Sequence, residues 1–309
     1  KIVRCRDTND DGQADEFIEF AKIDSPRGIV VTRGTEPKAT SIYVLHPPHL
    51  SVYHDDNGDG KSDRSDILVK NIGFDLNFRG ADHTTNGIQV GIDGWIYVAV
   101  GDYGFIKATG ADGREVQMKG GGIARVRPDG SELELVSRGQ RNIYDVAISP
   151  LMDLFTRDNT NDGGGWNVRL SYVPHGAQMG YPSLFLNFPD EIVQPLADYG
   201  GGSPCGSLFV DEPTLPGDLG HMLYTCDWGR SVIYRHRLTA NGAGFTAEQE
   251  SFIELPRPTD MEIDASGNMY ITSWKDGGFN FSNPNVGYLV KVKPPRTAQA
   301  PQRPTSAAD

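Results

Sequence analysis

One strand–turn–strand pattern occurs five times along this sequence and constrains the fold more strongly than its composition does. Each copy has an alternating strand, a turn that contains Gly or Asp, and a second strand that carries an aromatic residue. The copies recur at intervals of roughly forty to seventy residues, the spacing of β-propeller blades with insertions. Their aromatic residues are Tyr43, Tyr97, Phe155, Tyr224 and Tyr270. A second hairpin follows each copy, which gives each unit the four strands of a blade.

Two further segments at the N-terminus, 1–6 and 16–21, have the pattern of the outer strand pair of another blade. We expect its inner pair to lie upstream, because the chain opens directly in a strand at Lys1, without Met. The sequence therefore predicts an all-β, six-bladed β-propeller over residues 1–294, with the first blade incomplete at the N-terminus. Residues 295–309 are rich in Pro, Ala and Gln without apolar periodicity, which predicts a tail or linker.

The composition favours many short strands in one folded domain. The 309 residues include 37 Gly and 20 Pro with 38% hydrophobic residues, which is too apolar for disorder and too rich in turn formers for a helical protein. A formal net charge of -12 opposes binding to nucleic acid or to an anionic membrane, and favours neutral or cationic ligands and metal cations. No apolar run approaches about 18 residues, so we expect no transmembrane segment in this chain.

Two acidic loops share the pattern Asp-x-Asn-x-Asp-Gly-x-x-Asp. Oxygen ligands at alternate positions, with Gly at a sharp turn, suit a hard cation such as Ca²⁺, as in the first half of an EF-hand loop. Strands rather than helices flank both loops, so acidic hairpin turns are the other interpretation. We favour structural Ca²⁺ without a catalytic role. The candidate ligands are Asp7, Asn9, Asp11 and Asp15 in the first loop, and Asp55, Asn57, Asp59 and Asp63 in the second.

The three cysteines leave two interpretations open. Cys205 and Cys226 share a neighbourhood in sequence and could form a disulfide. All three, Cys5 included, could instead be buried thiols that act as small apolar groups. The sequence does not decide between these interpretations.

An Asp-His pair, Asp82-His83, comes just before the predicted inner strand 87–90, where loops meet at the central mouth of a propeller. A neutral imidazole can take the proton of a substrate hydroxyl near physiological pH, and a neighbouring carboxylate can orient the imidazole or hold the substrate. A pair that only makes hydrogen bonds within its loop is the commoner case. These two residues taken alone therefore favour a structural role.

The segment that begins with this pair resembles the active-site stretch of the soluble PQQ-dependent glucose dehydrogenases and their aldose and sorbosone dehydrogenase relatives. The shared pattern, Asp-His-x7-Gly-x-Asp-x3-Tyr-x3-Gly-Asp-x-Gly, is matched throughout by residues 82–104. Residues 139–147, 230–235 and 257–260 are similar to further elements of that family. The acidic loops and the segment at Asp158 resemble a branch of membrane-associated dehydrogenases that are often fused to haem-binding domains.

The resemblance implies a chemistry and a role for each matching residue. In that family a histidine deprotonates the sugar hydroxyl while hydride passes to a PQQ carbonyl polarised by Ca²⁺. The residues so implied are His83 as the base, Asp82 as a substrate ligand, Arg141, Asn142, Arg230 and Arg257 as cofactor contacts, and Asp158 and Asn159 as metal ligands.

Two departures from the family pattern weaken the expected cofactor site. Gly229 stands where the family has a cofactor-binding Lys, and Thr259 where it has a second Arg. PQQ carries three carboxylates, and each missing charge-assisted hydrogen bond costs roughly 1.5–3 kcal/mol. The loop at Asp158 also differs from the family's metal loop, and an acidic surface loop explains it equally well.

Functions from different classes therefore stay open, because fold does not decide among them. The first is a PQQ- and Ca²⁺-dependent oxidoreductase that oxidises a sugar or alcohol carbon and passes electrons to a haem domain or a cytochrome. The second is a non-catalytic, Ca²⁺-stabilised propeller that binds glycan or protein. The third is a propeller hydrolase or lyase. Calcium use and the resemblance imply a secreted or periplasmic location.

Overall fold

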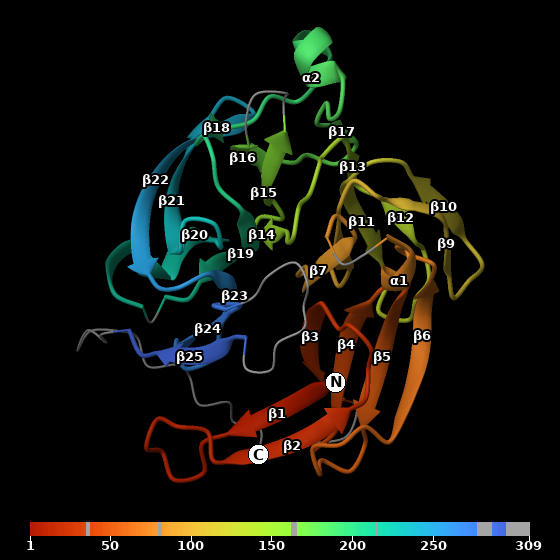
Figure 1. Ribbon diagram of the computed structural model, residues 1–309, viewed down its shortest axis with the longest axis vertical. Helices are drawn as coiled ribbons and strands as arrows, with labels where there is room; N and C mark the ends of the chain where they lie inside the picture. The colour runs from red at the N-terminus through yellow and green to blue at the C-terminus, as the bar shows by residue number, and fades with distance from the viewer. Residues whose placement is uncertain (35–37, 80–81, 162–165, 214, 277–285, 295–309) are drawn as a thin grey trace.

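Five antiparallel sheets follow one another around a common centre and form the blades of a β-propeller (Figure 1). The computed structural model describes residues 1–34, 38–79, 82–161, 166–213, 215–276 and 286–294. The blade strands are β3 (Gly28–Arg33), β4 (Thr40–His46), β5 (His49–Asp55) and β6 (Arg64–Lys70); β7 (Thr85–Val90), β8 (Ile96–Val100), β11 (Gly122–Val126) and β12 (Glu134–Leu135); β14 (Ala147–Ile148), β15 (Leu154–Asn161), β16 (Trp166–Tyr172) and β18 (Ala197–Asp198); β19 (Pro204–Asp211), β20 (His221–Asp227), β21 (Val232–Asn241) and β22 (Gly244–Glu254); and β23 (Pro258–Ile263), β24 (Met269–Ser273) and β25 (Tyr288–Val292). The first strand of each blade lies nearest the centre.

The strand–turn–strand repeat is confirmed in all five blades. Each repeat aromatic lies on the second strand of its blade, where it packs beside the inner strand. These residues are Tyr43 on β4, Tyr97 on β8, Phe155 on β15, Tyr224 on β20 and Tyr270 on β24. The remaining regular elements are short: β13 (Ser137–Arg138), β17 (Ala177–Gln178), α1 (Leu76–Arg79), α2 (Leu184–Asn187), and single-turn 3-10 helices at Pro189–Glu191 and Gly217–Gly220.

A sixth blade is not confirmed. The predicted strands near the N-terminus are present as β1 (Ile2–Arg6) and β2 (Glu16–Ala21), but they form a separate two-stranded sheet. That sheet lies between β25 and the first blade in Figure 1. Phe20 of β2 is buried with Ile2, Ile23 and Val44, so this sheet packs against β4 of the first blade.

An inserted hairpin widens the first blade. β9 (Phe105–Gly110) and β10 (Glu115–Met118) come between β8 and β11 in the chain, yet β9 pairs with β6 of the preceding blade through Val69 and Lys70. The resulting sheet has six strands in the order β10-β9-β6-β5-β4-β3. Its outer edge, β10, lies beside β12, the outer edge of the second blade (Figure 1).

The hydrophobic core lies between neighbouring blades. All five residues of β8 are buried, because blades cover this strand on both faces. Leu45 and Val69 of the first blade pack with Ile96 and Val98 of the second, and all four are fully buried. Each such side chain contributes about 1.5–3 kcal/mol through burial, so the layers between blades hold the ring together.

The three cysteines are unpaired in the structure. Cys5, Cys205 and Cys226 are free thiols, so the disulfide interpretation is wrong. Cys205 and Cys226 are buried, and burial raises the pKa of Cys205 to about 12, whereas Cys5 is exposed.

No helix in the described ranges is long and apolar enough to cross a membrane. Residues 295–309, the predicted tail, lie outside the described residues.

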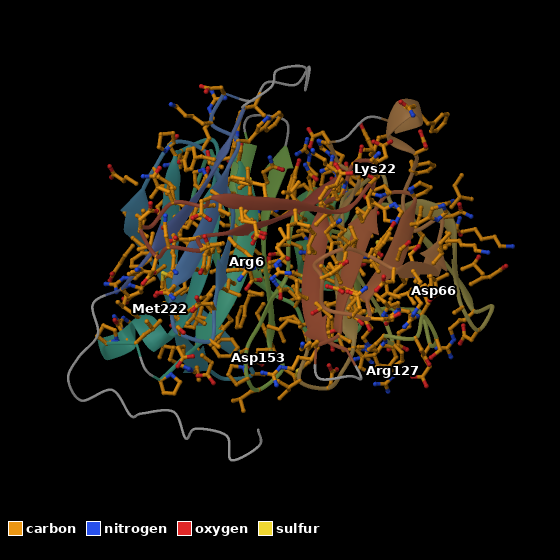
Figure 2. The ribbon with its side chains drawn as sticks, turned by 90° about the horizontal axis from the view of Figure 1, so that it is seen from below. Arg6, Lys22, Asp66, Arg127, Asp153 and Met222 are labelled. Carbon is orange, nitrogen blue, oxygen red and sulfur yellow. The ribbon has the colours of Figure 1, made fainter. Side chains whose placement is uncertain are left out.

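The two faces of the propeller are separated by the length of the strands. Figure 2, turned by 90° from Figure 1, shows the strands edge-on, with Lys22 toward one face and Arg127 and Asp153 toward the other. Lys22 follows β2, whereas Arg127 follows β11 and Asp153 precedes β15. The loops at the two ends of the strands therefore lie on opposite faces of the ring.

Candidate active site

The loop before β7 holds His83 in a backbone conformation that few residues other than Gly adopt. Its φ is 60°, in the left-handed region. The loop is fixed against the end of β8, because the His83 carbonyl accepts a hydrogen bond from Tyr103 N at 3.1 Å and the Thr84 carbonyl accepts one from Gly101 N at 3.0 Å. A Cβ at Gly101 would lie 2.5 Å from the His83 carbonyl oxygen, so this approach requires Gly. Strain of this kind is concentrated at functional sites.

The imidazole of His83 is held on three sides. Asp102, on the turn after β8, makes a short hydrogen bond to Nδ1. Tyr103 stacks on the ring, with centroids 5.5 Å apart and planes at 29°. Arg141 Nη2 lies 3.4 Å from Nε2. Since a guanidinium only donates, this contact assigns the proton to Nδ1 and leaves the lone pair on Nε2, the form that a general base needs.

Asp82 is oriented by two residues that follow Arg141 in the chain. Its Oδ1 accepts hydrogen bonds from Asn142 Nδ2 at 2.9 Å and from the Tyr144 hydroxyl at 3.0 Å. Its Oδ2 lies 3.6 Å from His83 Nε2. Burial, together with the charge of Asp82, raises the pKa of Tyr144, so this hydroxyl remains a donor across the physiological range. A carboxylate beside Nε2 would stabilise the imidazolium that forms when His83 takes a proton.

The backbone of Arg141 and Asn142 is anchored by Asp158, a buried residue on β15. Asp158 Oδ2 accepts from Arg141 N at 2.7 Å and Oδ1 from Asn142 N at 2.8 Å. Burial raises the pKa of Asp158 to about 6, although both backbone hydrogen bonds oppose the shift. Asn159 accepts from Arg141 Nη1 through its side-chain oxygen at 2.8 Å. These two predicted metal ligands are therefore engaged in positioning Arg141.

Arg230 and Arg257, the other predicted cofactor contacts, belong to a second cluster between the fourth and fifth blades. The guanidinium of Arg257 lies 4.3 Å from the ring centroid of Trp228, which packs against Trp274. Arg230 donates from Nε to the Gly201 carbonyl, and its backbone N–H donates to Asp227 Oδ1 at 3.0 Å. Asp227 thus holds the turn of Arg230, whereas the backbone N–H of Arg257 donates to Ser231 Oγ at 3.3 Å.

A buried ion pair joins the two clusters through β15. Arg157, the neighbour of Asp158, has its side chain 1% exposed, and its Nη2 lies 3.3 Å from Oδ2 of the fully buried Asp227. Arg157 Nη1 also donates to Thr225 Oγ1 at 3.0 Å. A buried ion pair is costly to break, since removal of either partner leaves an uncompensated charge. β15 thus connects the two clusters, because Arg157 pairs with Asp227 in the second cluster and Asp158 holds the backbone of Arg141 in the first.

The two acidic loops lie outside these clusters and share one hydrogen-bond pattern. In the second, Asp55 accepts from the backbone N–H groups of Gly58, Asp59 and Gly60 at 2.7–3.2 Å. In the first, Asp7 accepts from the equivalent Asp11 and Gly12 at 3.2 and 2.9 Å. Within the described residues no group of three or more His, Cys, Asp or Glu side chains is arranged to hold a metal ion. The loops are thus ordered by their own backbone.

The structure brings together four of the six residues predicted for catalysis and cofactor binding: Asp82, His83, Arg141 and Asn142. It also adds positions that sequence reasoning missed, namely Asp102 behind His83 and Tyr144 on Asp82, and it shows that Asp158 anchors the backbone of Arg141. The sequence did contain a signal for Asp102, because this residue is the Asp of the Gly-Asp-x-Gly end of the matched pattern.

Comparison with known proteins places the chain in a family. The family described as a domain of unknown function (DUF7133) matches residues 1–277. The chain belongs to the DUF7133 family. No curated protein sequence matches this DUF7133 chain.

Solved structures similar to this DUF7133 propeller share its fold at low identity. The PQQ-bound aldose sugar dehydrogenase of Streptomyces coelicolor has a TM-score of 0.62 and 16% identity, covering 89% of this chain and 84% of its own. The holo form of the pyranose dehydrogenase PQQ domain from Coprinopsis cinerea has a TM-score of 0.58 and 10% identity, covering 92% and 86%. These likenesses establish the propeller fold.

Proposed function

We propose that this protein is an oxidoreductase that oxidises a sugar or alcohol carbon by hydride transfer to PQQ. The observation that carries the proposal is the setting of the His83 imidazole, with Asp102 on Nδ1 and Arg141 and Asp82 beside Nε2. The sugar dehydrogenases with the same fold bind PQQ, which supports the choice of cofactor. A secreted or periplasmic location and a haem-domain or cytochrome acceptor form part of the same proposal.

The residues present fit a polycarboxylate cofactor in part. Arg141, Arg230 and Arg257 supply three cationic groups, and the buried Asn142 Oδ1 makes no hydrogen bond within the described residues. When bound, PQQ would supply the hydride acceptor and Ca²⁺ would polarise it. Arg141 would then hold a cofactor carboxylate while Asn159 fixes its guanidinium.

The protein's own groups would move the proton. His83 Nε2 would take the proton of the substrate hydroxyl as the hydride leaves the carbon that bears this hydroxyl. The substrate hydroxyl would then replace Arg141 as the partner of Nε2. The resulting imidazolium would be stabilised by Asp102 on one side and by Asp82 on the other. Asp82, oriented by Asn142 and Tyr144, keeps Oδ2 available for a second substrate hydroxyl.

Gly229 and Thr259 favour the second candidate, a non-catalytic propeller that binds glycan or protein. A Cβ at Gly229 would lie 3.0 Å from Ser203 Oγ, so a Lys there would need a local shift. Thr259 Oγ1 is hydrogen-bonded to Thr272 Oγ1 at 2.9 Å. Arg230 contacts Gly201 and so does not replace the absent Lys in this conformation. Two cationic contacts to the cofactor are therefore absent.

Reconstitution with PQQ and Ca²⁺ separates the two candidates. An oxidoreductase should shift the quinone absorbance and bleach a redox dye when an aldose is added. His83→Asn should keep the absorbance shift but lose the bleaching, since Asn tolerates the left-handed backbone and cannot act as the base. If the wild type binds no PQQ by calorimetry, the oxidoreductase proposal fails.

Structural Ca²⁺ in the two acidic loops and an incomplete sixth blade, with β1 and β2 as its outer strand pair, are further parts of the proposal. The two loops make equivalent hydrogen bonds, which supports the same role for both. Each carboxylate oxygen also has a lone pair that the backbone does not use and that could bind the cation. The packing of Phe20 against Val44 supports the second part, because it joins the β1–β2 sheet to the first blade.

A further inference from the structure

A groove of about 730 Å³ lies between the outer edges of two blades, and its lining includes no residue of the two clusters. One wall is β10, the edge of the six-stranded sheet, and the other is β12, the edge of the second blade. Figure 1 shows these two strands side by side at the periphery of the ring. β12 and β7 are opposite edges of one sheet, so the groove and His83 belong to different sides of that blade. Its volume is within the range of about 300–1,000 Å³ that is usual for ligand sites.

The groove is positively charged in a protein whose formal net charge is -12. Arg114, Lys119 and Arg138 line it and are exposed. Within the described part of the chain, Lys119 and Arg138 form no ion pair, and Arg114 has only the nearby charge of Asp112.

The two acidic residues of the lining are already neutralised. Glu115 pairs with Lys107 at 2.6 Å, and Glu134 pairs with Arg125 at 2.6 Å. The groove therefore attracts anions although the molecule as a whole repels them.

The walls indicate an extended ligand. An edge strand presents unpaired backbone N–H and C=O groups, to which another chain can add as a strand. Val116 and Leu135 are half-buried, pack against the core cluster between the first two blades and line the groove, so they offer apolar contact beside the cations. Successive side chains of a strand point to opposite sides, so a chain that alternates acidic and apolar residues would match both surfaces. No lining residue, all of them described, is aromatic, which disfavours a glycan that stacks on rings.

We propose that this groove binds an extended acidic peptide segment of a partner protein by strand addition to β10 or β12. The site is independent of the proposed redox function, because it uses neither His83 nor a cofactor. The cations select for acidic side chains, the strand edge selects for an extended backbone, and the apolar wall selects for alternating Val- or Leu-type residues.

The test uses the full chain and an acetylated, amidated eight-residue peptide that alternates Glu and Val. Isothermal titration calorimetry should detect binding that weakens as salt rises from 0.05 to about 0.5 M, because the Debye length falls severalfold. Lys119→Glu should raise Kd about three- to tenfold, and the double variant with Arg138→Glu by at least about tenfold. Lys22→Glu changes the net charge equally, but Lys22 follows β2 and does not line the groove, so this variant should change Kd less than about twofold.

Three outcomes would overturn the proposal. The first is no binding of the peptide by a wild type that shows native circular dichroism. The second is an equal effect of Lys22→Glu and Lys119→Glu, which would reduce the attraction to net charge. The third is a control ligand that matches or exceeds the peptide. This would be either equal binding of a peptide whose Val residues are replaced by Pro, which cannot add to a strand edge, or tighter binding of an oligogalacturonate, which would assign the groove to an anionic glycan.

Discussion

At His83, the sequence pointed to the residue but not to the contacts that surround it. The Asp82-His83 pair is visible as two adjacent letters, whereas Asp102 comes 19 residues later. The two meet because β7 and β8 pair antiparallel, with Thr85 opposite Val100, so that the loop before one strand lies against the turn after the other. Such contacts depend on register, which a local pattern does not fix. The contact between Asp82 and Tyr144 was missed for the same reason.

Variants of His83 and Arg141 should have separable effects on the proposed reaction. His83→Asn should lower kcat by at least about 10²-fold with little change in KM, because the base acts only as the proton moves. Arg141→Ala should instead weaken cofactor binding, by a few kcal/mol at most, and excess PQQ should restore part of the rate. Steady-state kinetics across a PQQ titration measures both. A His83→Asn enzyme whose loss is recovered by PQQ would contradict the assignment of the base.

At the scale of the strand, each blade has a Gly or Asp within its inner strand or just before it. Gly28, Gly87, Gly206 and Asp260 lie on β3, β7, β19 and β23, and Asp145 lies two residues before β14. The glycines make room for the acids: a Cβ at Gly87 would lie 2.5 Å from Asp145 Oδ1, and one at Gly206 would lie 2.2 Å from Asp260 Oδ1. Glu262 adds a third acid two residues further along β23, hydrogen-bonded to Gln89 of β7 at 3.3 Å. The sequence contained this alternation, but its meaning requires the ring.

The acids at the axis predict a stability that falls as the pH rises. Asp260 keeps exposed surface, but the protein atoms around its carboxyl group and the charge of Glu262 raise its pKa to about 7. Burial and the charge of Asp260 also raise the pKa of Asp145. The folded state therefore holds protons that the unfolded chain loses near pH 4. The stabilisation is complete below that pH and is lost as the pH rises through about 7.

Asp260→Asn isolates this effect, because the amide has no charge at any pH. The variant should melt about 2–4 °C above the wild type at pH 8, equivalent to roughly 1 kcal/mol, with the difference shrinking toward pH 4. Differential scanning calorimetry in matched buffers measures it. Asp264→Asn is the control, since surrounding hydrogen bonds lower the pKa of Asp264. A constant offset between Asp260→Asn and wild type across pH 4–8 would exclude the linkage.

The acidic loops give a second prediction at the scale of a turn. Chelation with EDTA should lower the melting temperature and Ca²⁺ should restore it, by about 5–10 °C if free Ca²⁺ reaches about 100 Kd. Asp11→Asn with Asp59→Asn should abolish the response without unfolding the loops, because an amide oxygen can still accept from Gln13 N and Lys61 N. Identical melting curves with and without EDTA would leave the loops as acidic hairpin turns.

Across the whole molecule, the sequence predicted the propeller and most of its blade strands but not how the ring closes. The repeat depends on local alternation, which is why the strand pairs of all five blades were placed correctly. The β9–β10 insertion and the two-stranded N-terminal sheet depend on which edges meet, and local alternation carries no information about that. The cysteines were undecided for a similar reason, since spacing along the chain does not give distance in space.

The closure of the ring can be tested at β2, where two phenylalanines of one strand have opposite environments. Phe20 is 5% exposed and packs with Ile2, Ile23 and Val44, whereas Phe17 is 64% exposed. If the β1–β2 sheet is an integral part of the propeller, Phe20→Ala should destabilise the whole domain by about 3–5 kcal/mol while unfolding in urea stays a single transition. Phe17→Ala should stay within about 0.5 kcal/mol of wild type. An unchanged main transition in Phe20→Ala, or a separate early one, would mean that the five blades are stable without this sheet.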